Sequence, residues 1–155
     1  MKRLLTLLGA LALPVVAQAD AGELAAAVAG KHRTEAYAAR DSYRNPVKTL
    51  ALFDVQPEHT VMEVWPGGGW YTEILAPYLR DEGLLIAAHY DSKDEQASYR
   101  PGSRERFEAK MAANSAVYSK VKVASLMFDE TSGELAKGAT GSNSVDRVLT
   151  FRNAH

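Results

Sequence analysis

The fold is decided by residues 61–71, which read Val-Met-Glu-Val-Trp-Pro-Gly-Gly-Gly-Trp-Tyr. An apolar stretch of strand length contains an acid, Glu63, and runs into three consecutive glycines that open an amphipathic segment. Glycine accepts a positive φ and has no β-carbon, so main-chain amides at such a turn approach a ligand closely. The stretch therefore predicts a strand–turn–helix of the kind that binds nucleotides, in which Glu63 holds a polar or cationic group.

Outward from this stretch, the hydrophobic pattern predicts alternating strands and helices. Strands are expected at residues 60–64, 84–88, 121–126 and 145–151, and helices at residues 46–54, 70–80 and 102–116, the first of them capped by Asn45. Residues 21–40 are expected to form a leader helix, residues 91–100 a polar loop, and residues 127–144 a surface loop with a short helix. This order predicts an α/β domain with a Rossmann-like parallel sheet, flanking helices and a ligand site at the carboxyl ends of the strands.

The predicted fourth strand lies next to the end of the sequence at His155, with no helix after it to cover it. An open apolar edge strand favours aggregation. The fold is therefore expected to be truncated after the fourth strand, as the N-terminal part of a longer protein. A complete domain whose open edge is protected by a partner is the alternative.

The first 19 residues have the pattern of a signal peptide. Lys2 and Arg3 precede an almost wholly apolar run, and residues 17–19, Ala-Gln-Ala, end in small residues at the spacing that signal peptidase accepts. The run is shorter than the roughly 20 residues that a membrane-spanning helix needs. We expect residues 1–19 to be removed, residues 20–155 to form one domain, and the protein to be secreted, in bacteria to the periplasm. An uncleaved anchor is the alternative.

Composition limits the function classes. The 155 residues include 18 basic and 19 acidic ones, so there is no basic surplus for nucleic acid. The absence of cysteine excludes disulfides, thiolate metal sites and a cysteine nucleophile. The histidines and their acidic neighbours lack the spacing of a metal site, so no metal is expected.

The segment from Glu63 to Gly69 resembles the signature of the class I S-adenosylmethionine-dependent methyltransferases, in which an acid in the first strand precedes glycines at alternate positions. Glu63 matches the acid, Gly67 and Gly69 match the second and third glycines, and Trp65 stands where the first is usually found. The longer run, residues 44–73, is similar to a family of exported predicted methyltransferases in which Trp-Pro-Gly-Gly-Gly is characteristic, and the resemblance extends over residues 40–155. It implies S-adenosyl-L-methionine as cofactor and transfer of its methyl group to an acceptor that the sequence does not identify.

The resemblance also implies which residues face the cofactor. S-adenosylmethionine carries a sulfonium, an amino group and a carboxylate, which suit a buried acid and the amides of a glycine turn. A polar group at the end of the second strand, roughly twenty residues after the last glycine, would bind the ribose hydroxyls. The expected cofactor-binding residues are Glu63, Trp65, Gly67, Gly68, Gly69, Tyr71, His89 and Asp91. A purely structural role, as helix cap, core aromatic or polar strand end, is the alternative.

Two residues after the fourth strand, Asn153 and His155, are the catalytic candidates, because the resembling enzymes place substrate-facing groups there. His155 would act as a general base. In the same scheme Asp129 falls near the adenine, with a solvated turn as the alternative. The chain has no Asn-Pro-Pro-Tyr sequence, so methylation of a nucleobase or glutamine nitrogen gains no support.

Two other functions stay open. S-adenosylmethionine is made inside cells, so an exported chain is alternatively a non-catalytic small-molecule binding protein on a methyltransferase-like fold. A nicotinamide-dependent domain is the third interpretation, but its fingerprint requires glycine at the position of Thr72.

Overall fold

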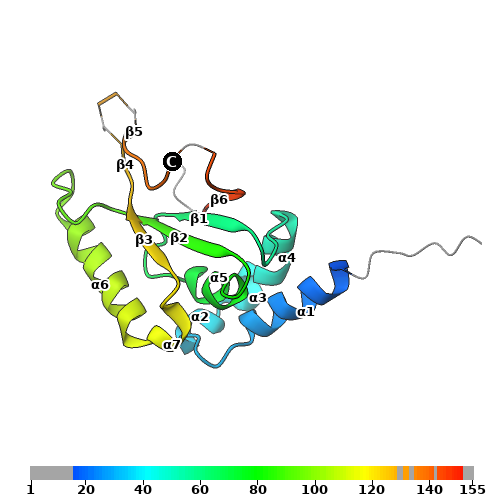
Figure 1. Ribbon diagram of the computed structural model, residues 1–155. Helices are drawn as coiled ribbons and strands as arrows, with labels where there is room; N and C mark the ends of the chain where they lie inside the picture. The colour runs from blue at the N-terminus through cyan, green and yellow to red at the C-terminus, as the bar shows by residue number, and fades with distance from the viewer. Residues whose placement is uncertain (1–15, 129–130, 133–134, 142, 152–155) are drawn as a thin grey trace, which may run out of the picture.

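The computed structural model describes residues 16–128, 131–132, 135–141 and 143–151. Its centre is a four-stranded parallel sheet in the order β3-β2-β1-β6 (Figure 1). The strands are β1 (Thr60–Val64), β2 (Leu84–His89), β3 (Lys122–Ser125) and β6 (Arg147–Thr150). The predicted α/β class and Rossmann-like parallel sheet are confirmed. Because the chain moves outward from β1 to β3 and then returns to the other side of β1, the strand order reverses beside β1, where ligands bind in such sheets.

Helices flank this sheet. They are α1 (Val16–Val28), α2 (Glu35–Ala38), α3 (Asp41–Arg44), α4 (Pro46–Leu52), α5 (Thr72–Tyr78), α6 (Tyr99–Ala113) and α7 (Ser115–Tyr118). Helix α1 packs against α4 and α5, and all three lie on the same side of the sheet in Figure 1. Within the described part of the chain, no helix combines the length and the apolar character needed to cross a membrane.

Three local predictions were wrong. Residues 21–40 do not form one helix, because α1 ends at Val28 and Gly30, a poor helix former, lies in the turn before α2. The polar loop expected up to residue 100 ends earlier, since α6 begins at Tyr99 and accommodates Pro101 in its first turn, where proline is tolerated. Asn45 precedes α4 but its side chain makes no capping hydrogen bond, because its backbone is left-handed with a φ of 45°.

Residues 127–144 also differ from the expected loop with a short helix. They contain an antiparallel hairpin of β4 (Met127–Phe128) and β5 (Leu135–Lys137), which follows the end of β3 (Figure 1). The chain stays extended beyond β3 because the Leu126 N–H donates to the His89 carbonyl at 2.8 Å, which continues the ladder between β2 and β3. Leu126 is itself buried.

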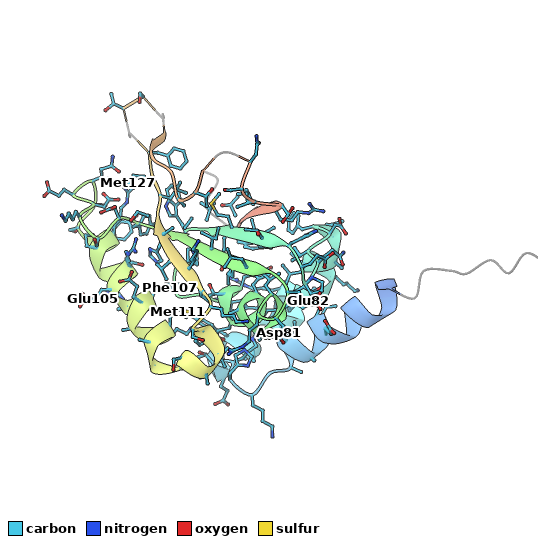
Figure 2. All side chains as sticks on the ribbon, in the orientation of Figure 1. Asp81, Glu82, Glu105, Phe107, Met111 and Met127 are labelled. Atoms are coloured by element: carbon cyan, nitrogen blue, oxygen red, sulfur yellow. The ribbon has the colours of Figure 1, made fainter. Side chains whose placement is uncertain are left out.

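The core lies between the sheet and the helices. Ile74, Leu75 and Leu79 of the α5 region are buried at helical spacing, as predicted. Phe107 and Met111, four residues apart on α6, are also buried and point toward the sheet (Figure 2). Burial alternates along β1, so that Glu63 and the core residue Val61 lie on the same face. The strand thus carries a carboxyl group into the core beside α5.

Candidate functional site

The turn after β1 has an unusual backbone. Its φ angle is 46° at Trp65, 60° at Gly67 and 84° at Gly69. A left-handed backbone costs a residue with a side chain about 1–2 kcal/mol. Trp65 is nevertheless held in it, because its N–H donates to the Ala88 carbonyl at 2.8 Å. Positive φ angles therefore occur at the three alternate positions where the signature quoted above has glycines, with tryptophan in the first.

At two of the three glycines, neighbouring side chains leave no room for a Cβ. A Cβ added at Gly69 would lie 3.1 Å from Cε2 of Phe107, and one added at Gly68 would overlap the hydroxyl of Tyr37. At Gly67 no atom lies within 4 Å of an added Cβ, so only the left-handed φ favours glycine there. The turn is closely packed on the side of α6 and open at Gly67.

Glu63 is the acid at this turn. Its side chain is buried, and Oε2 accepts a hydrogen bond of 2.6 Å from the Thr72 hydroxyl at the start of α5. Burial raises the pKa of Glu63 from 4.5 to about 7, and the Thr72 hydrogen bond lowers it by a smaller amount. Among the described residues Thr72 is its only hydrogen-bond partner. Oε1 is therefore the atom of Glu63 that is available to a ligand.

Glu63 lines a cleft of about 250 Å³ at the carboxyl end of β1. The glycine turn forms one wall, and the segment of α2 and α3 forms another with Tyr37, Arg40 and Arg44. On the α6 side of the turn lies a second cavity of about 340 Å³, which shares Tyr37, Gly67 and Gly68 with the cleft. The cleft and the second cavity are both lined by Gly67 and Gly68, so a ligand in either would contact the main chain of the glycine turn.

Glu73 of α5 attaches the α2–α3 segment to the turn. Its buried carboxylate accepts hydrogen bonds from the Thr34 hydroxyl at 2.6 Å and the Thr34 N–H at 3.0 Å, and forms an ion pair of 2.7 Å with Lys110. Lys110 and the Tyr37 hydroxyl both donate to the Gly68 carbonyl, at 2.9 and 3.2 Å. Glu73 therefore connects the N-terminal segment, α5 and α6 around the glycine turn.

Sequence reasoning missed Tyr37, Arg40 and Arg44 as site residues. They belong to a part of the chain where one leader helix was expected, and their approach to β1 depends on contacts such as that of Thr34 with Glu73, which the hydrophobic pattern does not encode. The one available signal was that Arg44 begins the run that resembles the exported methyltransferases.

The two candidates after β2 lie in different settings. His89 is fully buried; its Nδ1 accepts the Tyr90 N–H at 2.8 Å, so Nε2 carries the proton and donates to the Gly67 carbonyl at 3.3 Å. Burial lowers the pKa of His89, which keeps the ring neutral. Asp91 is buried and accepts the Lys93 N–H at 2.9 Å. His89 therefore holds the glycine turn through its hydrogen bond to Gly67. Asp91 holds the loop after β2 through its hydrogen bond with Lys93.

Aromatic side chains surround the turn. Tyr71 stacks on Phe151 with ring centroids 3.6 Å apart and an interplanar angle of 16°. The Trp65 ring lies 5.5 Å from that of Tyr90 and 5.9 Å from that of Phe128. Trp65 and Tyr71 both line the cleft while they pack against other rings, so their cleft-facing and core roles coexist.

Three residues named from the sequence, Asp129, Asn153 and His155, lie outside the described residues. Within the described ranges, no group of three or more histidine, cysteine, aspartate and glutamate side chains is placed to hold a metal ion.

No protein-family model matches the chain, and no curated protein matches it. The geometry alone therefore has to indicate the chemistry. A buried carboxylate beside an open glycine backbone is suited to a ligand that carries a cation and accepts main-chain hydrogen bonds. Two arginines, Arg40 and Arg44, line the same cleft.

Proposed function

We propose that this protein is an exported S-adenosylmethionine-dependent methyltransferase. The observation that carries the proposal is the turn at β1, where Glu63 is buried and the residues two, four and six positions later all have a positive φ. Such a backbone lets a ligand approach the main chain at the place where strand order reverses. The resemblance of residues 44–73 to exported predicted methyltransferases supports the same function.

The residues present fit the cofactor's polar end. Glu63 lines a cleft next to Gly67, and no atom lies within 4 Å of a Cβ added at Gly67, so a cationic group and its neighbours have room there. When bound, S-adenosylmethionine supplies an electrophilic methyl group, which leaves the sulfonium as the acceptor's lone pair forms the new bond. The protein's part is to hold donor and acceptor in line and to exclude water. Asn153 and His155 stay the candidates for the acceptor side.

The alternative is an exported binding protein that uses the same cleft without catalysis. It is favoured by the cleft volume of about 250 Å³, which is small for a site that encloses a whole nucleoside. A nicotinamide cofactor is less suited, because Thr72 occupies the third glycine position of that fingerprint and its hydroxyl bonds to Glu63.

Calorimetric titration of the mature full-length protein with S-adenosylmethionine and S-adenosylhomocysteine tests the proposal. We expect both to bind, and Glu63→Gln to weaken S-adenosylmethionine about tenfold or more, as is typical when a charged hydrogen-bond partner is lost. Glu105→Gln is the matched control, because Glu105 is exposed on the outer side of α6 (Figure 2). No heat from either compound at millimolar concentration would exclude the methyltransferase.

A further inference from the structure

A groove lies at the other end of the sheet from the cleft. Its volume is about 410 Å³, against about 250 Å³ for the cleft and about 340 Å³ for the second cavity. It is lined by α1, by the C-terminal part of α5 and by the turns that precede β1 and β2. Because β1 and β2 are parallel, these turns mark the amino ends of the strands. We call this feature the α1 groove.

The inner part of the α1 groove is apolar and firmly held. Ala27 of α1 and Tyr78 of α5 are buried there, and Pro57 and Pro77 are half-buried. The Tyr78 hydroxyl donates to the Val55 carbonyl at 3.2 Å, which fixes the ring. An aliphatic group that displaces water from such a surface is favoured by the hydrophobic effect.

The turn between α5 and β2 places two carboxylates at the rim of the groove. Asp81 and Glu82 are both exposed, and they lie beside α1 (Figure 2). The next residue, Gly83, packs directly on the chain before β1, because a Cβ added to it would overlap the carbonyl oxygens of Pro57 and His59. The position of the turn relative to the groove is therefore fixed.

The negative charge of the groove is not compensated by the described part of the chain. Glu23 of α1 adds a third exposed carboxylate, and none of the three forms an ion pair or a side-chain hydrogen bond with a described residue. No lysine or arginine lines the groove. Arg80, although it precedes Asp81, donates to the carbonyls of Ala116 and Val117 beside α7. The charge is therefore available to a cationic partner.

We propose that the α1 groove docks a basic segment of a partner protein. An aliphatic side chain of the segment enters the apolar part, and its lysine or arginine side chains pair with Glu23, Asp81 and Glu82. A protein segment fits because the three acids and Ala26 are exposed, so the groove is open along the surface and a backbone can cross it. Complementary charge selects such a partner and speeds its association. The inference does not depend on the proposed function, since the cofactor cleft lies at the carboxyl end of β1.

An NMR titration of the isotope-labelled full-length protein tests the proposal. The probe is a short peptide of alternating lysine and leucine. We expect shifts at the amides of α1 and of residues 77–83, and binding that weakens as salt is added. The same peptide with glutamate in place of lysine should not bind. With serine in place of leucine it should bind about tenfold more weakly, because the apolar contact is lost.

Two substitutions on α1 locate the bound peptide. Ala26→Lys puts a long cationic side chain into the groove, whereas Ala25→Lys makes the same change at an exposed neighbour that does not line it. Lysine is a good helix former, so both variants keep α1. Ala26→Lys should weaken the lysine–leucine peptide about tenfold, and Ala25→Lys less than about twofold.

The charge of the turn is tested by a double substitution. Asp81→Asn combined with Glu82→Gln should weaken the peptide about fivefold, because two exposed ion pairs are lost. Glu95→Gln combined with Glu105→Gln removes the same charge at exposed positions outside the groove and should leave binding unchanged.

Several results would overturn the proposal. These are the absence of shifts at α1 with millimolar peptide, equal binding by Ala25→Lys and Ala26→Lys, and equal weakening by the two double substitutions. If spermidine, a linear polyamine, shifts the same amides and binds as tightly as the peptide, the groove takes a small polycation instead. Concentration-dependent shifts of these amides without peptide would assign the groove to a second copy of the chain. Each of these results leaves the methyltransferase proposal unaffected, because no cofactor takes part in the test.

Discussion

Replacement of Glu63 by glutamine tests the electrostatics of the site without a ligand. Glutamine has nearly the same shape and keeps an oxygen that accepts the hydrogen bond from Thr72, so the packing beside α5 is preserved. What changes is the titration, because the amide is neutral at every pH. The comparison of Glu63→Gln with wild type therefore isolates the cost of placing a carboxylate in the core.

The direction and the magnitude of the change in stability with pH follow from the pKa of Glu63. Burial raises the pKa of Glu63 from 4.5 to about 7, so the native state binds more protons than the unfolded state between these values, and the free energy of unfolding falls as pH rises. This stabilising contribution is complete below the unfolded pKa and is lost as pH rises through the folded pKa. Between pH 5 and pH 8 the loss comes to about 2.5 kcal/mol, because one pKa unit corresponds to about 1.4 kcal/mol.

Urea denaturation of both proteins at several pH values between 5 and 8 measures this effect. The stability of Glu63→Gln relative to wild type should rise by about 2.5 kcal/mol over the range. Glu105→Gln, at the exposed position on α6, should show no such trend. If the difference between Glu63→Gln and wild type stays constant within about 0.5 kcal/mol, the carboxyl titrates normally and the reasoning is refuted.

Three further substitutions test how the turn is held, each by chemical denaturation at neutral pH. Glu73→Gln should lose about 3 kcal/mol, because its buried carboxylate is paired with cations; a loss below about 1 kcal/mol would contradict this. Gly69→Ala should cost about 2 kcal/mol and more than Gly67→Ala, since only at Gly69 would the new Cβ meet a ring atom, at 3.1 Å; the opposite ranking would contradict it. Trp65→Gly should cost about 2 kcal/mol, because lost ring contacts outweigh relief of its φ; a stabilised variant would contradict it.

The sequence predicted the sheet well because strand signals are local. Each central strand is a short apolar run between polar or glycine-rich turns, and the run that became β2 is buried on both faces as its unbroken hydrophobicity predicted. Within the site, the burial of Glu63 and the left-handed backbone at Gly67 and Gly69 also followed from the pattern, because an acid inside a strand and glycines after it have few other structural uses.

The second wall of the cleft was not predictable in the same way. The α2–α3 segment reaches the turn through polar and aromatic contacts between residues far apart in sequence, such as Thr34 with Glu73 and Trp70 with Tyr37. These contacts have no periodicity, and the alanine-rich composition around them suggested a continuous helix. One continuous helix would not have predicted that Arg40 lines the same cleft as Glu63, so this positive charge became visible only in the folded structure.

Trp65 shows why residue identity and backbone conformation have to be considered separately. A tryptophan in place of a glycine suggests that the main chain can no longer approach a ligand, yet its φ of 46° lies in the same left-handed region as those of Gly67 and Gly69. The indole is directed onto Tyr90 and Phe128, and the Ala88 carbonyl fixes the peptide. Since a left-handed tryptophan is costly, its retention between a buried acid and three glycines is expected where a ligand requires that backbone. A ligand-bound structure in which Trp65 leaves the left-handed region would refute this explanation.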